Sequence, residues 1–311
     1  MDWGRGWTNG LGEGSLPMLK DRVAGCWTLG WFCGSLTRAI VMGGYYTVGT
    51  WRYRVAPTFF RPLVPLLFKL FLIVHVTTGA VGLVLFWVPV LTRKGAAAHR
   101  KYGAAFSYLM FVTATMAFGM GTCTILAPVA THPHLTQRPE WIQGIFGWMM
   151  LYLSILTVSL VWHGLASVRN KRQHLVNRRW PNVSLNGLVI GAALYCAYRG
   201  WLIDETLMMG IAVVGVASGI TNLYFIFTDA PPRITYQLEH VKAAVGAGIS
   251  VYTAFMAFGF VRFMPSNALN PKMWSIPLIV GLAIIIYHQM RIRLTQRSAT
   301  ARAKTSDAAQ A

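Results

Sequence analysis

The fold is decided by one apolar stretch, Leu63–Leu91, which reads LVPLLFKLFLIVHVTTGAVGLVLFWVPVL. A helix that crosses a bilayer needs about 20 consecutive, mostly apolar residues, and this stretch exceeds that length. Lys69 lies early enough in it to extend its charge to the interface, which leaves His75 as the ionisable residue that needs an explanation. The stretch therefore predicts a transmembrane helix.

Six further stretches have the same character and predict the rest of the fold. One of them, Leu185–Tyr198, is short, and Arg199 and Trp201 can extend it as an interfacial end. We therefore expect an all-α, polytopic bundle of seven transmembrane helices. The six further spans are Ala104–Val129, Ile142–Val168, Leu185–Tyr198, Leu207–Thr228, Val241–Phe263 and Trp274–Met290.

The composition also indicates a membrane protein. Of the 311 residues, 55% are hydrophobic and 12% are charged, whereas a soluble domain carries about 25% charged residues. A net charge of +19 could indicate nucleic-acid binding, but the basic residues lie in short connectors between apolar stretches and in the tail from Arg291 to Lys304. That distribution is typical of cytoplasmic membrane loops. We expect contact with membrane lipid and no nucleic-acid partner.

The basic connectors predict the orientation of the chain. Residues 92–102 carry four basic residues and no acid, and residues 169–182 carry five basic residues. The connectors that alternate with these along the chain are nearly neutral, as at 130–141, or acidic, as at Asp204 and Glu205. Because positive charge is retained on the inner side, we expect 92–102, 169–182 and the C-terminus in the cytoplasm.

Three regions follow from this pattern. Residues 1–62 form an N-terminal segment in which Val23–Thr50 is apolar enough to be an eighth span, although an amphipathic helix lying in the interface is the alternative. Residues 63–290 form the transmembrane bundle. Residues 291–311 form a basic cytoplasmic tail that we expect to be disordered.

Four histidines are the candidates for a cofactor site, because ionisable groups inside spans are costly and mark functional positions. His75 lies about 16 residues, or about 24 Å of helix, from the inner end of its span, near the middle of the bilayer. His99, His163 and His240 lie close to the cytoplasmic ends of their spans. Equal depth does not establish proximity, because the order of the helices is open, and separate interfacial hydrogen bonds are the alternative.

Two site chemistries fit these positions. Haem b needs two neutral imidazoles at matching depth on facing helices, and His99 with His163 or His240 meets that condition. A zinc site of three histidines and a water is the second chemistry, with Glu239 or Asp229 as the general base. No HxxxH or HExxH spacing favours zinc, and Glu239 points to a different helix face from His240.

One combination of motifs resembles a known family. The run HVTTG at 75–79 is followed by TRKG at 92–95 and by HRKYG at 99–103. This pattern of HxxxG, a basic loop that ends in KG, and HRxxG resembles the bacterial integral membrane proteins grouped as domain of unknown function 2306. The resemblance covers about residues 70–293.

The resemblance implies a multi-pass protein of the bacterial cytoplasmic (inner) membrane and singles out His75, His99 and His240. It supplies no established activity. The chain departs from the family pattern around His240, where relatives carry a Trp before the histidine and an Arg-Met after it, while this chain has Tyr236 and Val241-Lys242. That departure counts against a preserved role for His240 within the family.

We therefore expect an integral inner-membrane protein with a histidine-bearing helical core that holds a haem or another cofactor. A non-enzymatic subunit or scaffold of a larger membrane complex is an alternative, because Gly215 and Gly219 form a GxxxG face that packs against a neighbouring helix. A metal-dependent membrane hydrolase is another. The sequence carries no Walker loop, GxSxG motif or dinucleotide fingerprint, and it does not decide whether the protein is an enzyme.

Overall fold

The computed structural model describes residues 45–48, 51–54, 63–135, 138–260 and 271–310, and the chain divides into two compact units, residues 1–60 and 61–311. In the first unit, the described residues form an antiparallel hairpin of β1 (Tyr45–Val48) and β2 (Trp51–Arg54). The predicted eighth span over 23–50 lies mostly outside the described residues. Where it is described it is strand β1 and not helix, in keeping with the strand preference of Tyr, Thr and Val.

The described part of the second unit is helical. The long helices are α2 (Leu63–Leu91), α3 (Ala97–Leu126), α6 (Met150–Arg169), α7 (Trp180–Leu202), α8 (Thr206–Phe227), α9 (Arg233–Ala254) and α10 (Pro271–Gln310). The short ones are α4 (Pro128–Thr131), α5 (Pro139–Ile142), the π-helical turns η2 (Gln143–Met149) and η4 (Phe255–Gly259), and the 3-10 turn η3 (His174–Arg178). Helices α5, η2 and α6 run on as one rod, as do α9 and η4.

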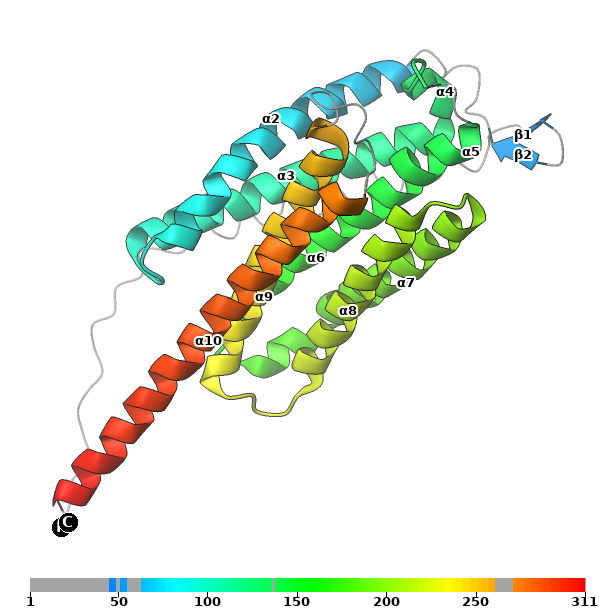
Figure 1. Cartoon of the computed structure of the whole chain (residues 1–311). Coiled ribbons are helices and arrows are strands. Elements are labelled where there is room, and N and C mark those ends of the chain that lie inside the picture. The colour runs from blue at the N-terminus through cyan, green and yellow to red at the C-terminus, as the bar shows by residue number, and fades with distance from the viewer. Residues whose placement is uncertain (1–44, 49–50, 55–62, 136–137, 261–270, 311) are drawn as a thin grey trace, which may run out of the picture. The chain divides into compact units, whose positions relative to one another are not determined.

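Helix α6 is the centre of the bundle (Figure 1). It packs against α3, α7 and α9, while α2 lies against α3, α10 against α9, and α8 against α7. Two thirds of the most apolar window of the α6 rod is buried (67%), compared with 17% in both α2 and α10. The apolar outer faces of α2 and α10 are therefore the ones left to contact lipid.

Six helices in the described part of the chain are long and apolar enough to cross a membrane: α2, α3, the α6 rod, α8, the α9 rod and α10. The sequence predicted seven spans and a possible eighth, which is more than this. The difference is α7, which is present and 23 residues long but is less apolar than the others. Its buried residues include Asn182 and Asn186, which face α6 and α8 and lower its hydropathy.

The tail also differs from the expectation. Residues 291–310, expected to be disordered, continue α10 as helix. Arg291, Arg293 and Leu294 are exposed, and the segment contains no Gly or Pro, so nothing in it ends the helix. Helix propensity alone accounts for its extension.

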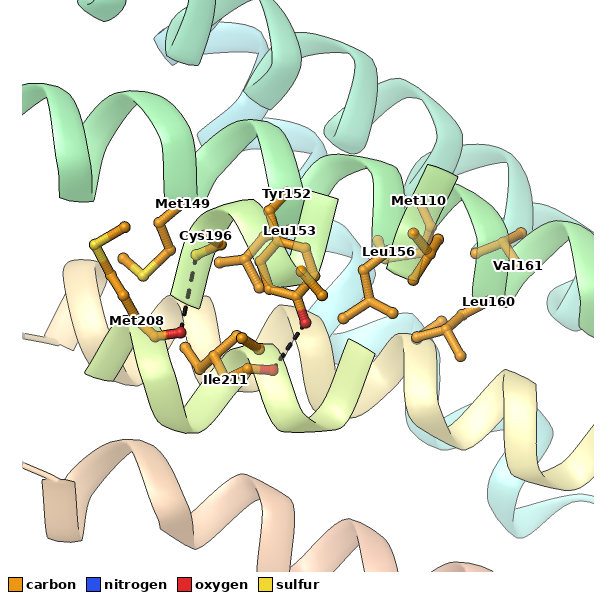
Figure 2. Close-up of a cluster of buried hydrophobic side chains, with 14 of the residues drawn as sticks. Met110, Met149, Tyr152, Leu153, Leu156, Leu160, Val161, Cys196, Met208 and Ile211 are labelled. Atoms are coloured by element: carbon orange, nitrogen blue, oxygen red, sulfur yellow. Dashed lines mark hydrogen bonds between the residues drawn. The ribbon is translucent and has the colours of Figure 1, made fainter. Parts of the chain in front are cut away.

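A cluster of buried side chains fills the space between α6, α7 and α8 (Figure 2). Tyr152 of α6 is 1% exposed, and its hydroxyl donates a hydrogen bond to the Ile211 carbonyl oxygen of α8 at 2.8 Å. A Cβ at Gly215 would lie 2.4 Å from that hydroxyl oxygen, and a Cβ at Gly219 would lie 2.5 Å from Ile190 of α7. The GxxxG face therefore packs helices within this chain, as a packing device should, and does not require a partner chain.

Candidate cofactor site

The helical unit contains a cavity of about 1380 Å³ between α2, α3, α6, α9 and α10. Its inner wall is apolar and includes Phe86, Phe106, Val161 and Val245. Its lining also includes three imidazoles, His99 from α3 and His240 from α9, which lie beside each other, and His288 from α10. A large apolar cavity with a few convergent polar groups is the usual form of a cofactor site.

One end of the cavity is lined by cations, and we call this end the basic mouth. It consists of Lys94, Arg100, Lys171, Arg172 and Arg233, all of which are exposed. These residues come from the connector after α2, the start of α3, the connector after α6 and the start of α9. The structure therefore brings the basic connectors that the sequence predicted to be cytoplasmic to one end of the bundle.

His99 is held in place by the end of α2. Its Nδ1 lies 3.0 Å from the carbonyl oxygen of Pro89, which belongs to the last turn of α2. Carbonyls of a last helical turn have no partner within the helix and are free to accept from side chains. Lys94 Nζ donates to the same oxygen at 3.0 Å. Burial and the positive charge of nearby Arg291 lower the pKa of Lys94.

His240 is held in place by α6. Its Nδ1 lies 2.8 Å from the carbonyl oxygen of Gly164. This contact requires close packing of α9 on α6, and a Cβ at Gly164 would lie 3.3 Å from the Cβ of Ala243 and 3.5 Å from the backbone nitrogen of Ala244. Glycine at this position therefore lets the two backbones approach and places His240 against α6.

The hydrogen bonds of His99 and His240 fix the same tautomer on both rings. A carbonyl oxygen only accepts, so each Nδ1 carries the hydrogen and each neutral ring keeps its lone pair on Nε2. Neither Nε2 makes a hydrogen bond to another described residue. An Nδ1–H bonded to a backbone carbonyl, with Nε2 left for the metal, is the usual setting of a metal-binding histidine.

The two rings also lie at a distance that suits one metal ion between them. Their centroids are 6.3 Å apart and their planes are inclined by 75°. With a metal–nitrogen bond of about 2 Å and a ring nitrogen about 1 Å from the ring centre, two imidazoles on opposite sides of one ion have centroids about 6 Å apart. The centroid separation of His99 and His240 is therefore of the size that two imidazoles on one metal ion would have.

The other two candidate histidines lie elsewhere. His163 Nε2 is 3.0 Å from Glu239 Oε2, and Lys242 Nζ is 2.6 Å from the same oxygen. His75 Nδ1 lies 2.9 Å from the carbonyl oxygen of Thr113 in α3. Neither His163 nor His75 lines the cavity. Of the two partners that sequence reasoning offered for His99, the structure brings His240 to it and ties His163 to Glu239.

Glu239 and His240 face different surroundings, as the sequence predicted from their adjacent positions on one helix. Glu239 contacts His163 and Lys242, whereas His240 contacts Gly164 and lies beside His99. Among the residues that the structure describes, no three His, Cys, Asp or Glu side chains come together as ligands for one ion. The predicted three-histidine zinc site has no counterpart in these residues.

A second polar feature was missed by sequence reasoning. Asn186 of α7 accepts from Ser159 of α6 at 3.3 Å and from Asn222 of α8 at 3.0 Å, and Asn182 accepts from the Trp162 indole at 2.6 Å. A cavity of about 10 Å³ adjoins this network, close to the smallest space that holds a water. The sequence signal for this network is three asparagines within apolar helices, Asn182, Asn186 and Asn222.

Comparison with known proteins adds no relative. No family model, no curated protein and no solved structure matches the chain. The resemblance to domain of unknown function 2306 therefore stays a prediction, and the function rests on the site itself.

Proposed function

We propose that this protein is an integral membrane haem b protein in which His99 and His240 are the two axial ligands. The observation that carries the proposal is the pair of imidazoles at 6.3 Å, from facing helices, with both Nε2 lone pairs uncommitted. The cavity that contains them, about 1380 Å³ with apolar walls, has room for a macrocycle as well as the iron.

Bis-histidine ligation also limits the chemistry. A bound haem would supply one-electron redox chemistry, and His99 and His240 would be the residues that hold it. The chain's own contribution is to hold the two rings in one tautomer, through the carbonyl oxygens of Pro89 and Gly164, and to surround them with an apolar wall. An electron carrier fits this arrangement better than a hydrolase.

The proposal includes an arrangement in the membrane. We place α7 as a seventh span because it runs beside α8 and, at 23 residues, is about 34 Å long. Seven spans put the connectors 92–96, 170–179 and 228–232 and the start of the tail on one side. The cations of 92–96, 170–179 and the tail support a cytoplasmic location of this side in a bacterial inner membrane, whereas 228–232 carries only Asp229.

The absorbance spectrum of the purified protein tests the function. We expect the wild-type protein, expressed with haem available and purified in detergent, to show a Soret band and, after reduction, the sharp α-band of a six-coordinate haem. His99→Ala and His240→Ala should each abolish or strongly shift these bands. His163→Ala serves as the control, because His163 lies near the same end of the bundle, on α6, but does not line the cavity.

The possible results separate the alternatives. A wild-type protein without a Soret band, or one whose bands persist in both the His99 and His240 variants, contradicts the haem assignment. Stoichiometric zinc in place of haem would favour the hydrolase. Neither haem nor zinc, together with co-purifying membrane proteins, would favour a subunit or scaffold.

A further inference from the structure

The basic mouth has a charge distribution that the axial histidines do not explain. The cavity lining contains five cationic side chains, Lys94, Arg100, Lys171, Arg172 and Arg233, and no Asp or Glu. All five lie at the end of the cavity formed by connectors and helix starts. A binding site with an apolar interior and an acid-free cationic end is complementary to a ligand that is apolar in its body and anionic at one edge.

Two of the five cations already form hydrogen bonds within the protein. Lys94 Nζ donates to the carbonyl oxygens of Pro89 and Val90, and Arg100 donates to that of Gly95 at 2.6 Å. These bonds close the connector between α2 and α3. The two bonds of Lys94 go to carbonyl oxygens in the last turn of α2, which have no partner within the helix, and they occupy two of the three N–H donors of Lys94.

The remaining three cations are available to a ligand. Among the described residues, the acids pair with His163, Arg178 and Lys242 and not with Lys171, Arg172 or Arg233. Arginine binds carboxylates with two parallel hydrogen bonds, and such bonds are stronger when the arginine is not already paired with an acid.

The spacing relates these cations to the histidines. Arg233 and His240 lie seven residues apart on α9, which is about two turns or about 10 Å along the helix. Residues seven apart share a helix face, and both line the same cavity. Arg233 therefore lies about two turns from His240 toward the end of the bundle, where the edge of a macrocycle held at its centre by His240 would point, and Lys171 and Arg172 line the same cavity.

From these observations we propose that Lys171, Arg172 and Arg233 bind the two propionate carboxylates of the haem and set the orientation in which the haem enters the cavity. This inference rests on the proposed function. It assigns to the cationic connectors a binding role in addition to their effect on membrane orientation.

The test compares haem with its dimethyl ester, which has the same iron and macrocycle but no carboxylate charges. Apo-protein in detergent is titrated with each compound and the Soret absorbance gives the two dissociation constants. We expect Arg172→Gln and Arg233→Gln each to weaken haem binding by about tenfold, the loss expected for one charge-assisted hydrogen bond. Binding of the ester should change little in either variant.

Arg179→Gln is the matched control, because it removes one exposed positive charge from the same end of the bundle outside the cavity. We expect it to leave both dissociation constants unchanged. Added salt should weaken wild-type binding of haem more than binding of the ester, because exposed charges are screened.

Failure of this inference is distinguishable from failure of the proposed function. A bis-imidazole spectrum with equal losses for haem and ester, or with no loss in either arginine variant, overturns the role of the mouth and leaves the axial histidines standing. A wild-type protein that gives no Soret band with haem overturns the haem assignment and this inference with it.

Discussion

The asparagine network between α6, α7 and α8 leads to a quantitative prediction about stability. Asn186→Ala removes the acceptor of two buried hydrogen bonds, from Asn222 Nδ2 at 3.0 Å and from the Ser159 hydroxyl at 3.3 Å. Asn222 and Ser159 are 0% and 2% exposed, so neither gains water in exchange. Asn222 Oδ1 has no partner among the described residues even in the wild type, which makes its Nδ2 bond the one contact that its side chain retains.

The magnitude follows from the two bonds. A buried polar group left without a partner costs about 1–3 kcal/mol in soluble proteins, but side-chain hydrogen bonds between transmembrane helices average about 0.6 kcal/mol and reach about 1.7 kcal/mol. Because the second bond is long, we expect Asn186→Ala to lower the free energy of unfolding by about 1–3 kcal/mol. The coupling energy between Asn186→Ala and Asn222→Ala should be about 0.5–1.5 kcal/mol.

The assay is reversible unfolding by sodium dodecyl sulfate in bicelles, applied to the wild type, the two single variants and the double variant. Ser184→Ala is the control on the same helix, since Ser184 is exposed and its hydroxyl bonds only to carbonyls of α7. It should change stability by less than about 0.5 kcal/mol. Additive effects of the Asn186 and Asn222 substitutions on the free energy of unfolding would refute the hydrogen bond between these two side chains.

Three further predictions concern the surroundings of the site. Gly248→Val should lower the free energy of unfolding by about 1–3 kcal/mol and reduce haem retention, because a Cβ at Gly248 would lie 2.3 Å from Phe86 on the cavity wall. Full retention of haem in this variant would show that Phe86 does not shape the cavity. Glu239→Gln should lower stability by a similar amount without changing the absorbance spectrum, because Glu239 pairs with His163 and does not line the cavity; a changed spectrum would contradict that placement. Burial and neighbouring His134 lower the pKa of His132 to about 4, whereas the same imidazole in the unfolded chain takes up a proton below about pH 6.5. Thermal stability should therefore fall as the pH drops from about 6.5 toward 4, and His132→Phe should reduce that dependence on pH. An identical dependence in the variant would exclude His132 as its source.

The sequence predicted the helices well and their ends less well. Every predicted span between Leu63 and Met290 overlaps a helix, because runs of apolar residues are long and unambiguous. Helix α3 begins at Ala97, seven residues before the predicted start, since its first turns are polar and hydropathy does not register them. For the same reason α7 begins five residues before Leu185, at Trp180, whereas its extension through Arg199 and Trp201 to Leu202 agrees with the expected interfacial end.

The depth of the candidate histidines in their helices was predictable from the sequence, but which of them lie beside each other was not. The similar depth of His99 and His240 in their spans follows from counting residues. Their proximity depends on α3 and α9 facing each other beside α6, which is a property of helix order that one sequence does not contain. The role of His163 could have been suspected, since a buried histidine and Glu239 at equal depth favour an ion pair over two separate sites.

The scaffold interpretation loses one of its supports. Gly215 and Gly219 were its main sequence evidence, and both are covered by Tyr152 and Ile190 of the same chain. The apolar outer faces of α2 and α10 are accounted for by lipid contact, which needs no partner subunit.

The most direct test of the account is the electron paramagnetic resonance spectrum of the oxidised, haem-loaded protein at low temperature. The two imidazole planes are inclined by 75°, and nearly perpendicular axial imidazoles give ferric haem a highly anisotropic low-spin signal. We predict that signal in the wild type and its loss in His240→Ala. A high-spin signal in the wild type, or a low-spin signal that survives the substitution, would contradict axial ligation by His99 and His240.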